Sequence, residues 1–567
     1  MRRWVVSLLL GAACFGALLT GYRSLANEQS SLARYVPSGA LLYLEARDFS
    51  ALLSDWNNSS EKAQWLRSAD YEAFSHSRLF ARLQQASEEF TTAAGLPPNM
   101  NLVSQVAGSR SALALYDIGK LQFLYITKLD SSKAGQSELL QSRSKFETRS
   151  AGGVMFYYRQ DAKSGREVAF AATNDYLLLA TREDLMAASL DLLAGSKAPS
   201  ITEDEWWGRA VAAASEPGDL RMVLNMEKIV PSPYFRSYWI QQNITAMKAY
   251  SAAVSDLYFV GAEYREQRVL LKKTVDATAS PINLSGHGAA DLERLVPADA
   301  GVYQIEASPS ADLCLELLET KLLAPHTGPG VASNIAPQVN LSSGATGAAG
   351  DLETRIDQPP PEAPAQAARP DSLKALFAGN PVRAVLSVQR TNLTNEGAFV
   401  RFQTGVVLLG SSDWNQPVVL SAVTGFVRPM LTASALGLTW KPSGGYQELD
   451  GLWKLSVASH GKYLFLSDDP RLLDEMLSNL NEKSSAPSAV FIGGFNDTGE
   501  RARFALLTNM LDGQNAPWSK NSGRAPSFFS DNIASLSSVF SGVSSEKVVV
   551  RDAGDKVLQT VTYQWAK

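Results

Sequence analysis

The sequence predicts an α+β protein built from two tandem copies of one module, each an antiparallel sheet covered by helices, after an N-terminal signal or anchor helix. Three observations predict this class: the length of the chain, a stretch that occurs twice, and short apolar runs divided by turns. At 567 residues the chain exceeds the length at which one hydrophobic core keeps growing. Two or more domains are therefore expected.

The repeated stretch reads RYVPSGALLYLEA at residues 34–46 and RLVPADAGVYQIEA at residues 294–307. The shared positions pair Arg34 with Arg294, Val36 with Val296, Pro37 with Pro297, Ala40 with Ala300 and Tyr43 with Tyr303. A second pair of blocks, residues 175–193 and 462–480, repeats a tyrosine and a series of leucines. Two blocks in the same order indicate a tandem duplication, and we expect the four shared Val and Tyr side chains to face cores.

The boundaries of the copies follow from this alignment. We predict a first module over residues 34–279 and a second over residues 292–567, with the junction near the glycines of residues 286–293. The second copy has extra chain between its two blocks, and residues 325–370 supply it. This run is rich in Pro, Gly, Ala and Ser, a composition typical of a disordered insertion.

Local patterns predict the elements of the first copy. Residues 39–46 form a short apolar run behind a proline, which favours a strand. Strand patterns recur through residues 111–181, and their short connections favour antiparallel pairing. Helical spacing predicts helices over residues 48–56, 71–95 and 182–195.

The end of each copy repeats a simpler theme of strand, long helix and alternating hairpin. In the first copy these segments are residues 219–226, 234–254 and 256–277, and in the second they are residues 488–496, 527–543 and 547–567. The final hairpin contains the turn signal DAGD.

The N-terminus carries the clearest functional signal. Arg2 and Arg3 precede an uncharged apolar run over residues 4–20, and small residues offer a cleavage site before Asn27. The run is marginal for spanning a bilayer and long for the apolar part of a signal peptide. The sequence predicts export, with residues 1–26 either cleaved as a signal peptide or retained as a membrane anchor.

Composition narrows the partners. The 52 basic and 57 acidic residues give a net charge of −5, without the basic excess that binding to nucleic acid requires. Besides Cys14, in the N-terminal apolar run, the chain has only Cys314, so we expect no disulfide in the exported part. Cys314 lies in an apolar helical pattern without a basic neighbour, which predicts a buried structural thiol.

Motifs for catalysis or cofactor binding are not found. The four histidines, His76, His287, His326 and His460, show no metal-ligand spacing, and no nucleophile elbow or phosphate loop is present. Trp206 and Trp207 either stack on a sugar or partner when exposed, or anchor a helix to the sheet when buried. We therefore predict no catalytic, metal or cofactor residue.

The opening of the first copy shows a family likeness. The pattern VPxxAxxYL over residues 36–44, followed by GxxxALAL over residues 108–115, resembles a family of exported bacterial proteins known as a domain of unknown function. The second copy matches this pattern over residues 296–303. The resemblance implies an envelope protein and supplies no catalytic residue.

These features favour a non-enzymatic binding or scaffold protein in the periplasm, or anchored to the inner membrane and facing the periplasm. Its expected partner is an envelope protein, a peptide or a lipid. Two alternatives stay open: a chaperone or carrier for apolar cargo in a groove, and a hydrolase whose site is assembled from scattered residues.

Overall fold

A computed structural model describes most of the chain from Ser31 onward. The described residues are 31–67, 69–76, 78–233, 247–261, 263–273, 287–323, 371–393, 400–431, 439–450, 454–482, 488–496, 500 and 543–565. The predicted signal or anchor at residues 1–26 and the predicted insertion at residues 325–370 lie outside them. Within the described ranges no helix is long and apolar enough to cross a membrane.

The chain divides into two compact units. Unit 1 comprises Met1–Asn283 together with Asn496–Lys567, and unit 2 comprises Leu284–Phe495. The break near Asn283 falls close to the predicted junction. The predicted second module, residues 292–567, differs from unit 2 because the C-terminal hairpin joins the sheet of unit 1.

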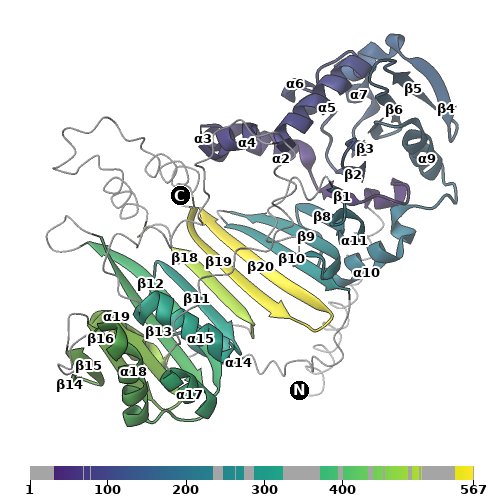
Figure 1. Ribbon diagram of the computed structural model, residues 1–567. Helices are drawn as coiled ribbons and strands as arrows, with labels where there is room; N and C mark the ends of the chain where they lie inside the picture. Colours follow the sequence, from purple (N-terminus) through teal and green to yellow (C-terminus); the bar gives the residue numbers. More distant parts are fainter. Residues whose placement is uncertain are drawn as a thin grey trace, which may run out of the picture. The chain divides into compact units, whose positions relative to one another are not determined.

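The sheet of unit 1 is antiparallel throughout, in the order β4-β5-β6-β7-β3-β2-β1-β8-β9-β10-β20-β19. Its strands are β1 (Leu42–Ala46), β2 (Ser111–Asp117), β3 (Gln122–Lys128), β4 (Glu147–Ala151), β5 (Val154–Gln160), β6 (Glu167–Thr173), β7 (Tyr176–Ala180), β8 (Leu220–Asn225), β9 (Tyr250–Val260), β10 (Glu263–Lys272), β19 (Val543–Asp552) and β20 (Lys556–Trp565). Figure 1 shows β9, β10, β20 and β19 side by side.

Helices cover both faces of this sheet. They are η1 (Leu32–Tyr35), α2 (Phe49–Asn58), α3 (Ser60–Leu66), α4 (Ala69–Ser75), α5 (Arg78–Ala94), α6 (Met100–Val106), α7 (Ser131–Gln136), α8 (Glu138–Gln141), η2 (Ser142–Lys145), α9 (Glu183–Leu193), η3 (Ile201–Glu203), α10 (Glu205–Ala213) and α11 (Met226–Ile229). One core lies under η1, α9 and α10, and a second lies under α5 to α8.

The sheet of unit 2 is antiparallel too, in the order β14-β15-β16-β17-β13-β12-β11-β18. Its strands are β11 (Val302–Ala307), β12 (Val382–Leu393), β13 (Val400–Gly410), β14 (Thr439–Ser443), β15 (Tyr446–Asp450), β16 (Leu455–His460), β17 (Tyr463–Ser467) and β18 (Phe491–Asn496).

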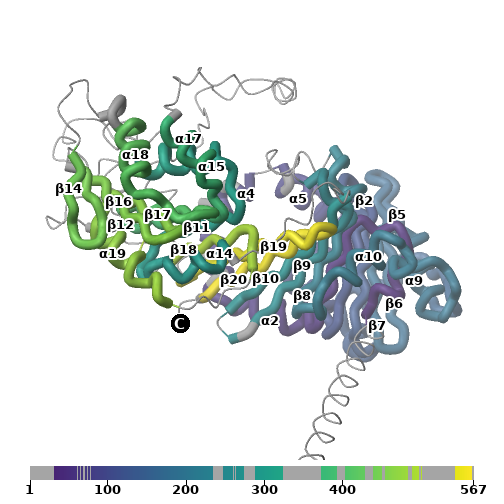
Figure 2. The backbone as a smooth tube through the Cα atoms, turned by 90° about the horizontal axis from the view of Figure 1, so that it is seen from below, coloured from purple at the N-terminus to yellow at the C-terminus, as the bar shows by residue number. Residues whose placement is uncertain are grey.

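Helices again lie on both faces. They are α14 (His287–Glu293), α15 (Ala311–Leu318), η4 (Glu319–Leu323), α17 (Asp371–Gly379), α18 (Gln416–Leu431), α19 (Pro470–Ser478) and η6 (Asn479–Asn481). Figure 2 shows α15, α17 and α18 on one side of the strands and α14 and α19 on the other. The first group encloses a core with leucine and valine side chains of β12, β13, β16 and β17.

All eight described strands of the unit 2 sheet have counterparts in the same order in unit 1, so the α+β duplication predicted from the sequence is confirmed. Reading along the chain, β1 to β8 take the same positions in unit 1 that β11 to β18 take in unit 2. The first repeated block supplies β1 and β11. The second supplies β7 with α9, and β17 with α19.

The two repeated blocks lie against each other within each unit. In unit 2, Arg294 donates a hydrogen bond of 3.1 Å to the hydroxyl of Tyr463 and further bonds to carbonyls that follow α19. In unit 1, Tyr35 packs edge-on against Tyr176, with ring centroids 5.6 Å apart. The similarity between the copies therefore reflects the docking of the opening segment on the seventh strand and its helix.

The shared Val and Tyr positions are not buried equally in the two units. Val36 and Tyr43 are fully buried, and Tyr43 packs at a right angle against Trp207, with centroids 4.9 Å apart. Val296 and Tyr303 are half-buried. Tyr303 instead packs across Gly494, its partner on β18, where a Cβ atom would lie 2.1 Å from the ring.

Two predicted helices need correction. The pattern over residues 71–95 divides into α4 and α5. The helix predicted over residues 234–254 overruns, because Tyr250 to Val254 belong to β9; its remainder up to residue 246 lies outside the described residues. The helix predicted over residues 527–543 also lies outside them, except that Val543 begins β19.

The glycine at the partner position of Tyr303 gives a first prediction. Gly494→Ala should lower the free energy of unfolding of unit 2 by about 1–3 kcal/mol, because the new methyl group overlaps the Tyr303 ring. Gly379→Ala is the control, since a Cβ there meets nothing within 4 Å. Chemical denaturation measures both. Equal stability of the two variants would contradict this packing.

The C-terminal hairpin gives a second prediction. Ending the chain before Val543 removes β19 and β20 and leaves β10 without its partner strand. We expect a lower unfolding temperature for unit 1 and self-association through the uncovered edge, measured by calorimetry and light scattering. If the hairpin served unit 2 instead, the transition of unit 1 would stay unchanged.

Candidate functional site

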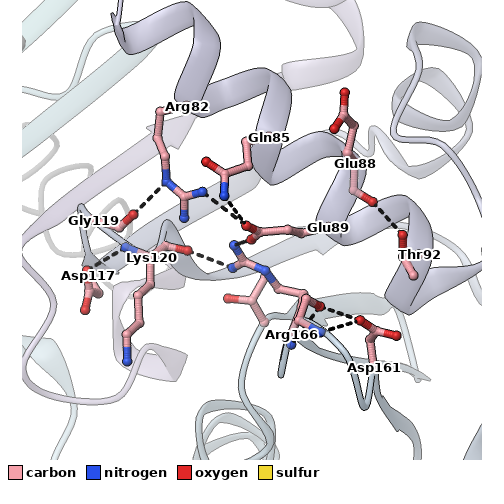
Figure 3. A network of polar contacts seen from close by, with 12 residues as sticks. Arg82, Gln85, Glu88, Glu89, Thr92, Asp117, Gly119, Lys120, Asp161 and Arg166 are labelled. Carbon is pink, nitrogen blue, oxygen red and sulfur yellow. Dashed lines mark hydrogen bonds and ion pairs between the residues drawn. The ribbon is translucent and has the colours of Figure 1, made fainter.

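A network of charged side chains in unit 1 fastens α5 to two turns of the sheet (Figure 3). Arg166 donates to the carbonyl of Lys120 at 2.7 Å and pairs with Glu89, while Arg82 donates to the carbonyl of Gly119 at 2.8 Å and also pairs with Glu89. Burial favours a higher pKa of Glu89, but its bonds to the two arginines outweigh this and hold the pKa below its usual range. These groups satisfy one another, which indicates a structural role.

A comparable network in unit 2 surrounds Arg390 on β12. Its guanidinium pairs with Asp299, in the loop before β11, at 2.7 Å and with Glu475 of α19 at 2.7 Å. On the corresponding strand of unit 1, the Tyr116 hydroxyl donates to the carbonyl of Pro37 in the loop before β1, at 2.7 Å. Both contacts hold the loop that opens the module, so this network also supports the fold.

The residues singled out in the sequence do not converge. Trp207 is buried against Tyr43, and Trp206 is half-buried with its indole N–H toward Asp204 at 3.3 Å; the pair thus follows the buried interpretation. His76, His287 and His460 stand at the ends of separate elements, and His326 lies outside the described residues. Among the described residues no group of three His, Cys, Asp or Glu side chains could hold a metal ion.

Cys314 is fully buried in α15, as the sequence predicts. Burial, with a smaller contribution from the charge of Glu306, raises the pKa of its thiol to about 12. The thiol is therefore protonated at neutral pH. Because the thiolate is the reactive form, Cys314 is unsuited to act as a nucleophile.

A hollow beside Cys314 is the candidate binding site. It has a volume of about 150 Å³ and lies between strands β11 and β12 and the helical segment of α15 and η4. Its lining consists of Gln304, Glu306, Leu313, Glu316, Leu317, Thr320 and Val385. The floor is thus partly aliphatic, and the polar groups are two carboxylates, an amide and a hydroxyl.

The local sequence explains how these groups reach the hollow. Gln304 and Glu306 are two residues apart on β11, so their side chains leave the same face of the sheet. Leu313, Glu316 and Leu317 recur at helical spacing on α15. The helix then continues into η4, a π-helical turn that carries Thr320, and such turns often occur at functional sites.

Glu306 is the most perturbed group of the hollow. Desolvation alone raises the pKa of its carboxyl above the ordinary range. Among the described residues, no side-chain hydrogen bond or ion pair engages this carboxylate. A half-buried carboxylate without a partner is costly, and a perturbed acid in a hollow is the kind of group that binds a ligand.

The polar face of β11 has no counterpart on β1 of unit 1. When β1 is aligned with β11 through Tyr43 and Tyr303, Leu44 takes the position of Gln304 and Ala46 takes that of Glu306. The copies therefore share the residues of the fold but differ in polarity at this face. Sequence reasoning missed Glu306, although continuing the alignment past the tyrosine shows the apolar-to-polar change.

Comparison with known proteins does not assign a ligand or a function to this hollow. No protein-family profile matches the chain, and no curated protein matches it. Among solved structures, crystal form I of TP0453 matches with 12% identity and a TM-score of 0.24, covering 43% of this chain and 79% of that chain. Crystal form IV gives 12% identity and a TM-score of 0.23, covering 42% and 79%. Superpositions at this level carry no information about a ligand.

The raised pKa of Glu306 gives a third prediction. Its carboxyl binds a proton more tightly in the folded chain than in the unfolded chain, so its contribution to stability is favourable at low pH and is lost as the pH rises through the folded pKa. Glu306→Gln should therefore gain stability relative to the natural protein when the pH is raised from about 4 to about 7.5. Calorimetry at the two pH values measures this.

The matched control for this prediction is Asp312→Asn. Asp312 lies on the same helix, does not line the hollow, and has a side chain that is 77% exposed. We expect the free energy of unfolding of the Asp312→Asn variant to match that of the natural protein at both pH values. If the difference in stability between Glu306→Gln and the natural protein is the same at both pH values, desolvation of Glu306 is contradicted.

Proposed function

We propose that the protein is an exported envelope protein that acts by binding a partner, with the hollow of unit 2 as a contact point. The supporting observation is the partly desolvated carboxylate of Glu306, which forms no side-chain hydrogen bond or ion pair among the described residues and stands where the first copy has Ala46. The first copy carries the apolar Leu44 and Ala46 at this face of the strand. The change to polar groups in one copy therefore favours a binding role for that copy.

The size of the hollow favours a protein or peptide partner. Pockets for whole small molecules have volumes of roughly 300–1,000 Å³, whereas this hollow measures about 150 Å³. It is large enough for one side chain. The aliphatic part of its lining is small, which favours a binding protein over a carrier of bulky apolar cargo.

The environment of the site favours binding over covalent catalysis. The nearest thiol, Cys314, is buried and protonated at neutral pH. The residues lining the hollow include neither a histidine nor a lysine that would activate the Thr320 hydroxyl. In the proposal the N-terminal apolar segment, residues 4–20, delivers the protein to the periplasm or anchors it there.

Site-specific photo-crosslinking in the native cells tests this function. A photoreactive amino acid replaces Leu317, which lines the hollow, or Val418, which is 53% exposed on α18 and does not line it. We expect one discrete covalent adduct from position 317 and none of that mass from position 418. Adducts of the same pattern from both positions, or none from either, would overturn the proposal.

A further inference from the structure

We propose that the hollow of unit 2 receives the side chain of a lysine from the partner protein, with its ammonium group against Glu306 and its methylene stem against the aliphatic lining. This inference rests on the proposed function and specifies the chemistry of the contact. It is carried by the placement of acceptors and aliphatic groups in one small hollow.

The polar lining matches an ammonium group. A lysine ammonium has three donors and no acceptor. The polar side chains of the hollow supply acceptor oxygens: the carboxylates of Glu306 and Glu316, the amide oxygen of Gln304 and the hydroxyl of Thr320. A carboxylate ligand would meet two negative charges there, so an anionic partner group is disfavoured.

The apolar lining matches the stem of the same side chain. Leu313 and Leu317 of α15 and Val385 of β12 line the hollow together with the acceptors. Lysine buries its methylene groups along apolar surface while its charged end reaches polar groups. A hydrated metal ion would bind only to the oxygens and would not contact the aliphatic side chains.

The energetics of Glu306 favour a cationic occupant. In the free protein its carboxylate is partly desolvated and no described group neutralises it. Part of the cost of removing the carboxylate from water is therefore already present in the folded state. An incoming ammonium ion forms a charge-assisted hydrogen bond, which is about twice as strong as a neutral one.

Two lysines near the hollow, Lys321 and Lys374, bind other residues and not Glu306. Lys321, on η4, donates to the side-chain oxygen of Gln389 at 3.1 Å. Lys374, on α17, lies 4.0 Å from Asp312, which does not line the hollow. Neither lysine is part of the lining. The hollow thus offers acceptors to a cation from outside the described chain.

Ligand titration of the full chain in lipid nanodiscs tests the inference. The methyl groups of Leu313 and Leu317 are observed by NMR while butylammonium chloride or the neutral 1-butanol is added. We expect butylammonium to shift both methyl signals with an affinity on the order of millimolar, which suits so small a ligand. 1-Butanol should shift them far less. Equal effects of the two compounds would overturn the inference.

Variants show whether the charge of Glu306 carries the binding. Glu306→Gln should weaken butylammonium binding about tenfold or more, as expected when a hydrogen bond between charged groups becomes neutral. Asp312→Asn removes a charge from the same helix outside the hollow and should leave the affinity within about twofold. Unchanged affinity in Glu306→Gln would contradict the inference.

A last pair of ligands distinguishes a protein lysine from a free diamine. Nα-acetyl-lysine methylamide presents the side chain on a peptide-like backbone, whereas 1,4-diaminobutane is a free polyamine fragment. We expect the lysine amide to bind at least as tightly as the diamine; markedly tighter diamine binding would overturn the assignment to a partner's lysine. An adduct from position 317 without any ammonium effect would retain the proposed function and reject this inference alone.

Discussion

The antiparallel ladder between β10 and β20 is the interaction on which the division of the chain depends. It runs from the pair of Glu263 with Gln564 to the pair of Leu271 with Lys556. Lys272 strengthens it with an ion pair to Asp552 at 2.7 Å, and this pair outweighs the effect of burial and lowers the pKa of Asp552. Because β10 is the last strand of the first copy and β20 the last of the second, equivalent hairpins cover each other's edges. The C-terminal hairpin thus covers the edge of β10, and β19 becomes the last strand on this side of the sheet.

Within each unit, a second constraint fixes where the sheet begins. The loop that precedes the first strand is held against the second strand, and each copy uses a different side chain for this. In unit 1 the Tyr116 hydroxyl binds the carbonyl of Pro37, and in unit 2 the buried guanidinium of Arg390 pairs with Asp299. The Arg390 guanidinium is buried but the Asp299 side chain is 67% exposed, so solvent screens this pair and makes it weaker than a fully buried one. The role is preserved although the chemistry differs.

The sequence was sufficient for the fold class and the duplication because the repeated residues are those that pack. Arg294 and Tyr463 come from different blocks and meet in space. The membership of the last hairpin could not be predicted, since alternating side chains specify a strand but not its neighbour. The local pattern of residues 250–254 is compatible with a helix or a strand. These residues form part of a strand because β9 pairs with β8 and β10. The hollow was missed because its residues form no motif and are recognised only by comparing the copies.

That comparison also explains how the polar face of β11 can arise without loss of the fold. Tyr303 keeps the place of Tyr43 in the strand but leans across Gly494, whereas Tyr43 packs against Trp207. The same strand then presents Gln304 and Glu306 on its opposite face, toward α15. In unit 1 the equivalent face carries Leu44 and Ala46, and Ala46 is buried. A carboxylate there would lose its hydration without gaining a partner. Since the first copy keeps this face apolar, the shared fold does not require the partly desolvated Glu306 of the second copy.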